Sequence, residues 1–191
     1  MCPDGPSSPT LSDEDKQALL RLARQTLTDY LSNGTVPDLR TDSPTLLELR
    51  ATFVTLRSKD TDELRGCRGE VIARHPLIES VAHTVVSSAT EDPRFPAVTE
   101  AEVPHLHIEI SALTPMVPIL PEEIVIGQHG LMIQKGPYAG LLLPQVPAAY
   151  GWDREEYLEA LCHKAGLPSS AWHEPDIDLV SFEAEVWEEE K

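Results

Sequence analysis

Residues Leu64–Gly69, with the sequence Leu-Arg-Gly-Cys-Arg-Gly, bring together side chains that could do chemistry. A guanidinium close to a cysteine favours the thiolate, which is the nucleophilic form of the side chain. Side chains alternate between the two faces of a strand, so an extended segment would place Arg65 and Cys67 on one face and Arg68 on the other. The spacing therefore predicts a reactive thiol at Cys67, with Arg65 as its cation.

Two glycines, Gly66 and Gly69, lie on either side of the cysteine. Glycine lets another group approach the backbone closely, so we assign both to a substrate-binding segment together with Arg65. A structural alternative stays open, because free cysteine often packs as a small hydrophobe and glycine near a strand often marks a bulge or a turn. The residues alone place no general base at a fixed spacing from Cys67.

Two further residues are candidates for proton transfer. His129 precedes Gly130 in a tight loop, where a small neighbour allows close approach, although most loop histidines are simply exposed. Glu109 lies between apolar residues on the strand predicted for 107–113, and if its face points into the fold its charge needs a partner such as an arginine. We therefore expect Cys67, Glu109 and His129 to form the catalytic set of an enzyme.

The stretch Asp92-Pro93-Arg94-Phe95-Pro96 predicts a rigid turn, because two prolines fix the backbone around an arginine and an aromatic ring. In a functional interpretation the turn forms the wall of a cleft, with Arg94 as a contact for an anionic substrate. In a structural interpretation it is an anchored connector.

The sequence predicts no metal site and no cofactor. His105 and His107 could share a strand face, but no cysteine or further histidine joins them in sequence, and metal sites need three or four protein ligands. The three cysteines are odd in number and lack a short spacing, so they form neither a disulfide framework nor a zinc pattern. Such cysteines are typical of a reducing compartment, and we expect a cytoplasmic protein.

The composition limits the classes of function. The chain has 191 residues and a formal net charge of −17, with 41% hydrophobic and 5% aromatic residues, which fits a globular protein with a mainly aliphatic core. This acidity would repel a phosphate backbone and an anionic membrane surface, so it argues against nucleic-acid and membrane binding. The sequence shows no apolar run long enough to span a bilayer and no signal peptide.

Hydrophobic periodicity and capping residues predict helices and strands in a mixed α/β (α+β) fold. Ser12 and Gly34 fit the two ends of an amphipathic helix, and Asp153 with Glu156 resembles a capping box of another. A third helix begins near Pro76. The predicted strands are 51–57, 64–72, 107–113, 124–127, 130–135, 139–143 and 180–186.

Several motifs resemble, in order, those of the AMMECR domain family. They are Leu64-Arg65-Gly66-Cys67-x-Gly69, Asp92-Pro93-Arg94-Phe95-Pro96, Ile108-Glu109-Ile110-Ser111-x-Leu113-Thr114-Pro115, His129-Gly130-Leu131, Gly140-Leu141-Leu142-Leu143-Pro144-Gln145-Val146, Gly151-Trp152 and Lys164-Ala165-Gly166-Leu167-Pro168. Each motif alone is weak, but the ordered set is specific.

The resemblance implies two mixed α/β subdomains, with mainly antiparallel sheets and flanking helices, around a cleft. It implies one domain over residues 12–187, with a boundary between subdomains near 115–121. We expect a disordered tail at 1–11 and an acidic tail at 188–191. The family has isoleucine where this chain has Arg68, and an arginine there must reach solvent or meet an acid.

Two functions remain in competition. The first is a cysteine-dependent enzyme for an unknown small molecule, or an accessory component that acts with the Memo-like and radical S-adenosylmethionine proteins encoded beside or fused to relatives of the family. The second is a non-catalytic binding or adapter domain, in which Cys67 is packed and the Arg-Gly-Cys segment contacts an anion or a protein partner's peptide. The lack of a complete catalytic set in the sequence motivates the second function.

Overall fold

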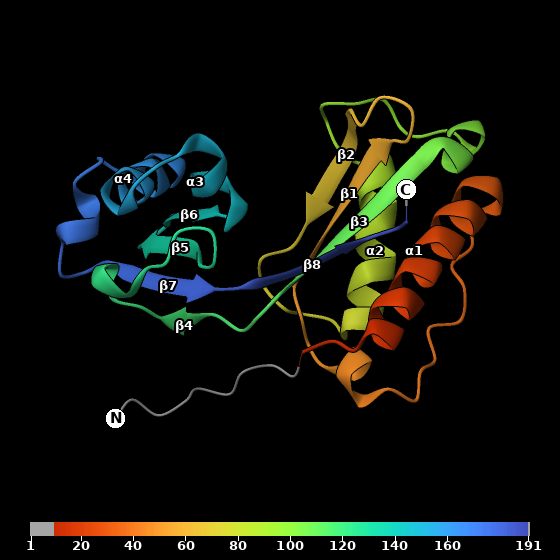
Figure 1. Ribbon diagram of the computed structural model, residues 1–191, viewed down its shortest axis with the longest axis horizontal. Helices are drawn as coiled ribbons and strands as arrows, with labels where there is room; N and C mark the ends of the chain where they lie inside the picture. Colours follow the sequence, from red (N-terminus) through yellow and green to blue (C-terminus); the bar gives the residue numbers. More distant parts are fainter. Residues whose placement is uncertain (1–9, 191) are drawn as a thin grey trace. The chain divides into compact units, whose positions relative to one another are not determined.

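The computed structural model describes residues 10–190, so the part of the predicted tail at 1–9 lies outside the described residues. The described chain forms two compact units, which we call the larger unit (residues 10–113 and 185–190) and the smaller unit (Thr114–Ala184). Each contains a four-stranded antiparallel sheet and helices that pack against it, which confirms the predicted mixed α/β class (Figure 1). Of the helices between residues 10 and 190, none is long and apolar enough to cross a membrane.

In the larger unit, helices cover one face of the sheet (Figure 1). The strand order is β2-β1-β3-β8, and the elements are α1 (Asp13–Asn33), η1 (Pro44–Leu47), β1 (Thr52–Ser58), β2 (Leu64–Gly69), α2 (Leu77–Thr90), η2 (Glu100–His105), β3 (Leu106–Leu113) and β8 (Ala184–Glu188). Val54, Leu56, Ile108 and Ile110 are buried in the core with residues of α1 and α2. Because side chains alternate along a strand, Thr55 of β1 lies on the opposite face, together with the residues that pair with it in the neighbouring strands.

The smaller unit is built around its own core. Its strand order is β4-β7-β5-β6, and its elements are β4 (Val117–Pro118), η3 (Pro121–Glu123), β5 (Gly130–Lys135), β6 (Tyr138–Leu142), α3 (Gln145–Tyr150), α4 (Arg154–Lys164), η4 (Ala171–His173) and β7 (Asp178–Phe182). Leu131 and Ile133 of β5 are buried with Leu158 and Leu161 of α4. The predicted hairpin of β5 and β6 is confirmed, whereas α3 was not predicted.

Local sequence explains the ends of α1 and the start of α4. The Ser12 side chain accepts a hydrogen bond from the backbone N–H of Asp15, and Gly34 ends α1 in a left-handed conformation with φ 74°. Asp153 and Glu156 form the expected capping box of α4. These predictions are confirmed because a cap depends on residues within one turn.

Two predicted strand segments are wrong. Strand β2 ends at Gly69 instead of continuing to Ile72, which is exposed and gains nothing from a place on the sheet. Residues 124–127 do not form a strand, because a 3₁₀ helix begins at Pro121 and a turn follows in which Gly127 has φ 85°. An apolar run alone does not separate a short strand from a packed turn.

The strand predicted over 180–186 is two strands that belong to two different sheets, β7 and β8. The Thr114 N–H donates to the carbonyl of Glu183 (2.8 Å), and the Glu183 N–H donates to Thr114 Oγ1 (2.8 Å), so Glu183 leaves the strand ladder. After this break Trp187 is buried and Val186 is exposed, which reverses the predicted face. The chain returns to the larger unit for its last strand.

Residues at the inner ends of both predicted tails make contacts within the fold. Leu11 is buried, and its N–H donates to the carboxylate of Glu185 (3.1 Å). At the other end Glu188 is the last residue of β8, and Glu189 accepts a hydrogen bond from Arg24 Nε (2.9 Å). These residues are therefore part of the folded larger unit.

Replacing Gly66 with alanine should destabilise the larger unit. A Cβ at this position would overlap the backbone carbonyl of Ser88 in α2, which cannot rotate away as a side chain could. We expect urea unfolding to show a loss of about 2–3 kcal/mol, the upper part of the range for overpacking. Gly34→Ala is the control: its added Cβ meets nothing, so it tests only the left-handed backbone, which costs about 1 kcal/mol. A Gly66→Ala loss no larger than the control would contradict the close approach of β2 to α2.

Candidate functional site

Cys67 lies on the sheet face opposite to the helices. In the strand register, Cys67 of β2 and Glu109 of β3 both pair with Thr55 of β1, so the three side chains share this face. Cys67 is partly exposed, and Thr55 Oγ1 donates a hydrogen bond to its Sγ (3.5 Å). The thiol is therefore not sealed in the core.

A buried carboxylate, that of Asp92, fixes the backbone of Cys67. Only 3% of the Asp92 side chain is exposed. Its Oδ2 accepts hydrogen bonds from the N–H of Cys67 (2.8 Å) and from Arg94 Nη2 (2.7 Å). Its Oδ1 accepts from the backbone N–H (3.1 Å) and Nε (2.9 Å) of Arg94. Four hydrogen bonds thus offset the cost of burying this charge.

Arg94 is held on one side and open to solvent on the other. Its Nη2 also donates to the carbonyl of Cys67 (3.4 Å), and its guanidinium carbon lies 5.4 Å from the ring centre of Phe95. Even so, 55% of the Arg94 side chain is exposed. The turn at 92–96 is therefore an anchored connector that also presents a cation beside the cysteine.

The pair of Asp92 and Arg94 shifts both pKa values as an ion pair should. The hydrogen bond from Arg94 lowers the pKa of Asp92 far below its usual value, more than burial raises it, and the N–H of Cys67 adds to the lowering. The hydrogen bond to Asp92 raises the pKa of Arg94, and the charge of Cys67 acts in the same direction. Arg94 thus lies within electrostatic reach of the thiol.

Arg65, expected beside the thiol, makes its contacts elsewhere. The pairing of β1 with β2 has a β-bulge at Arg65, which has no partner in the register. Its guanidinium binds Glu102 Oε1 (2.8 Å) and the carbonyl of Pro96 (2.9 Å), and it lowers the pKa of Glu102 to about 2. Regular alternation does not hold across a bulge, so the cation found next to Cys67 is Arg94. A ligand-binding role of Arg65 stays a prediction.

Gly66 and Gly69 have packing roles. A Cβ on Gly66 would overlap Ser88, and one on Gly69 would overlap the ring of Phe53 and the backbone of Thr52. The two glycines therefore let β2 approach its neighbours closely. Their assignment to substrate binding stays a prediction.

Glu109 and Cys67 lie on strands that are separated by β1. Neighbouring strands are about 4.8 Å apart, so these two strands lie about 10 Å apart, with Thr55 between the side chains. This distance is too long for direct proton transfer between Glu109 and the thiol. The assignment of Glu109 to the catalytic set stays a prediction.

His129 lies in the smaller unit, directly before β5. Its Nδ1 accepts a hydrogen bond from the N–H of Val125 (3.2 Å), and its carbonyl accepts one from the Tyr157 hydroxyl (3.2 Å). Because Nδ1 is an acceptor, the neutral imidazole carries its proton on Nε2. The role of His129 as a base for Cys67, which belongs to the larger unit, stays a prediction.

Arg68 meets both conditions expected of a charged residue at its position. Its side chain is 44% exposed, and its Nη2 lies 4.0 Å from a carboxylate oxygen of Glu91. It lines a cavity of about 250 Å³ with hydroxyl groups of α2, those of Ser80, Thr84 and Ser87. The cavity wall therefore accommodates the arginine without burying an unpaired charge.

The two histidines considered as metal ligands pair with separate acids. His107 Nε2 lies 3.1 Å from Glu188 Oε2, and His105 Nδ1 lies 3.9 Å from a carboxylate oxygen of Asp60. Across residues 10–190, no group of three or more His, Cys, Asp or Glu side chains is arranged to hold a metal ion.

The sequence did not identify Asp92 as part of the site. An aspartate two residues before an arginine, in a turn fixed by proline, could have indicated the ion pair with Arg94. The hydrogen bond from Cys67 to Asp92 joins residues 25 apart in the chain, and no local pattern indicates it.

Comparison with known proteins gives the family. The AMMECR1 family model matches residues 20–187. The chain belongs to the AMMECR1 family. It is 43% identical over 190 residues to a protein of Thermococcus gammatolerans, with 94% of this chain and 93% of that protein covered. The crystal structure of the uncharacterized protein PH0010 from Pyrococcus horikoshii is 41% identical, with a TM-score of 0.83 and 94% of each chain covered.

A second relative, protein MK0488 of Methanopyrus kandleri, is 41% identical over 189 residues, with 95% of this chain and 91% of that protein covered. The AMMECR resemblance predicted from the ordered motifs is therefore confirmed over nearly the whole chain. Because these AMMECR1 relatives align along almost their full length, the match covers both the larger and the smaller unit.

Asp92 should make the protein less stable in acid. Its pKa is lower in the folded state than in the unfolded chain, so its stabilising contribution is complete above the unfolded pKa and is lost as the pH falls toward the folded value. Between about pH 5 and pH 2, we expect the free energy of unfolding to fall more steeply in the unmodified protein than in Asp92→Asn. Urea titrations measure both slopes. Asp38→Asn, at an exposed aspartate paired with Arg40, should leave the slope unchanged, and equal slopes for all three proteins would contradict the prediction.

Proposed function

We propose that this AMMECR1-family protein is a binding domain that recognises an anionic group of its ligand through Arg94, beside Cys67. The observation that supports this proposal is an exposed guanidinium held in place by a buried carboxylate. An arginine already fixed in its binding geometry loses little conformational freedom when a ligand arrives.

The hydrogen bonds of Arg94 leave part of its guanidinium for a ligand. Nε and Nη2 bind Asp92, and Nη2 also binds the carbonyl of Cys67. The hydrogen bonds found within residues 10–190 do not include the two N–H groups of Nη1. These two donors fit a carboxylate or a phosphate oxygen.

The net charge of −17 favours a small ligand group over a polyanion. An acidic protein repels anions at long range, so a site for an anion must act at short range through directed donors. A single carboxylate or phosphate can make such contacts, whereas an extended nucleic acid would meet the surrounding acids.

The surroundings of the thiol support ligand binding better than they support covalent chemistry. The side chain found in hydrogen-bond contact with the Cys67 sulfur, among the described residues, is that of Thr55, whose hydroxyl is a poor general base. Glu109 lies two strands away. A nucleophilic cysteine needs a base or a strongly cationic setting, and Asp92 already offsets much of the charge of Arg94.

A cysteine-dependent enzyme is the second candidate, and one observation favours it. Arg94 Nη2 donates to the carbonyl of Cys67 (3.4 Å), so a cation lies beside this residue, and a nearby cation favours the thiolate form of a cysteine. Glu109 and His129 would complete the catalytic set. An accessory role beside a Memo-like or radical S-adenosylmethionine protein, which the family resemblance implies, belongs to this candidate.

The free cysteines support a reducing compartment such as the cytoplasm. Cys67 is partly exposed and Cys162 is buried, and each is a free thiol. An exposed free thiol persists where the surroundings are reducing.

Replacing Arg94 with alanine should abolish anion binding at the proposed site. We expect inorganic phosphate and acetate, titrated at low salt, to shift the amide NMR signals of residues 67 and 94 in the unmodified protein and in Cys67→Ser, because the serine variant keeps the backbone contacts. Arg94→Lys should bind more weakly, since a lysine lacks the forked donors.

Arg40→Ala is a matched control, because Arg40 also pairs with an aspartate two residues before it (2.9 Å) but is almost fully exposed. It should leave the titration unchanged. If Arg94→Ala still binds the anions, and its other amide signals show that it is folded, the proposal is refuted.

If cysteine chemistry is the function, Cys67 should react with iodoacetamide faster than a free cysteine near pH 7. Arg94→Ala should slow the reaction, because it removes the cation that stabilises the thiolate. Peptide mapping by mass spectrometry assigns the rate to Cys67 rather than to the other cysteines. A rate equal to that of a free cysteine in both proteins would count against the second candidate.

A further inference from the structure

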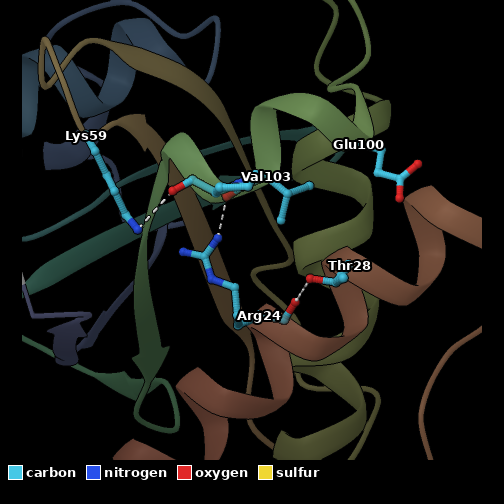
Figure 2. A pocket seen from close by; sticks show the side chains of 6 residues that line it. Arg24, Thr28, Lys59, Glu100 and Val103 are labelled. Atoms are coloured by element: carbon cyan, nitrogen blue, oxygen red, sulfur yellow. Dashed lines mark hydrogen bonds between the residues drawn. The ribbon is translucent and has the colours of Figure 1, made fainter.

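A second cavity, of about 340 Å³, lies in the larger unit and shares no lining residue with the Arg94 site. It is formed by α1, η2 and the residue that follows β1, and we call it the α1–η2 cavity. Figure 2 shows the side chains that line it: Arg24, Thr28, Lys59, Glu100, Val103 and Pro104. Its volume falls at the lower end of the range for sites of small molecules.

Arg24 forms a fixed polar part of the cavity wall. Its Nη1 donates to the carbonyl of Val103 (2.7 Å) and its Nη2 to the carbonyl of Leu106 (2.7 Å), as Figure 2 shows for the first of these. Its Nε donates to Glu189 (2.9 Å), so a carboxylate balances its charge. Arg24 therefore orders the wall but adds little net charge to the cavity.

Lys59 supplies the charge that remains. Its Nζ donates to the carbonyl of Pro104 (3.1 Å), which uses one of the three N–H donors of the ammonium. The ion pairs found among residues 10–190 do not include Lys59, although the chain has 32 acids and 15 Lys and Arg residues. In Figure 2, Lys59 and Arg24 both reach toward backbone carbonyls of η2.

Glu100 is the acidic residue of the lining, and it faces another partner. Its Oε1 accepts a hydrogen bond from the Ser32 hydroxyl of α1 (2.8 Å). In Figure 2 it lies on the side of the cavity away from Lys59. The lining therefore has a cation at one side and an acid at the other, with Val103 between them in Figure 2, and its exposed apolar residue is Pro104.

We propose that the α1–η2 cavity binds a small molecule that carries a carboxylate or phosphate group on a short apolar body. The oxyanion contacts the ammonium of Lys59, and the apolar body lies against the ring of Pro104. A compact ammonium with two remaining donors suits a single oxyanion, and the acid at the far side disfavours a second negative charge on the ligand.

NMR titrations at low salt test this site with three probes: butanoate, inorganic phosphate and butylammonium. Butanoate or phosphate should shift the amide signals of residues 59, 100 and 103, and butylammonium should not. Lys59→Met keeps the length of the side chain without its charge and should weaken binding of the anion about fivefold or more. Glu100→Gln keeps the acceptor for Ser32 and removes the repelling charge, so it should strengthen binding about twofold or more.

Lys164→Met, at an exposed lysine of the smaller unit, is the matched control and should change nothing. The relative size of the butanoate and phosphate responses identifies the oxyanion. Equal binding in Lys59→Met and the unmodified protein would overturn the proposal, and so would shifts that appear only around residue 94. Because Arg94→Ala leaves the α1–η2 cavity intact, binding there can fail or succeed independently of the proposed function.

Discussion

The buried carboxylate of Asp92 is the interaction on which the rest of the site depends. A carboxylate so little exposed needs several donors, and it obtains them from the backbone of Cys67 and from Arg94. The same four bonds therefore set the position of the thiol-bearing strand, of the turn at 92–96 and of the exposed guanidinium. Moving any of these breaks at least one hydrogen bond to a buried carboxylate, so the arrangement is held together before any ligand binds.

This interaction also closes the edge of the sheet. Strand β2 is an edge strand, and unpaired edges invite pairing with other chains. Asp92 and Arg94 bind the N–H and the carbonyl of Cys67 at this edge. On the inner side of β2, Gly66 lets α2 come close enough for Ser88 to accept a hydrogen bond from the N–H of Arg68 (2.9 Å) and to donate one to the carbonyl of Val54 in β1 (2.8 Å). At the proposed site, a ligand would therefore meet the Arg94 guanidinium rather than an open strand edge.

In this acidic chain, some cations are bound within the fold and others have donors that a ligand could use. Arg24 and Arg65 bind carboxylates and backbone carbonyls with most of their donors, so they hold elements together. Arg50 also binds Glu185 and the carbonyl of Leu113, and its Nη1, which has no hydrogen-bond partner among the described residues, is buried out of reach of a ligand. Arg94 and Lys59 instead keep exposed donors that the fold does not use. The two proposed anion sites follow from this difference, not from the net charge.

The sequence by itself determined the features that depend on near neighbours. The sequence was enough to predict the caps at Ser12 and Asp153, the α/β class and the family motifs. Capping and alternation involve residues within a few positions of one another. Only the tertiary structure decided which acid each arginine meets. One bulged residue moved Arg65 to Glu102, and a hydrogen bond across 25 positions brought Asp92 and Arg94 to Cys67. Such pairings depend on which distant segments pack together, and the local sequence does not indicate this packing.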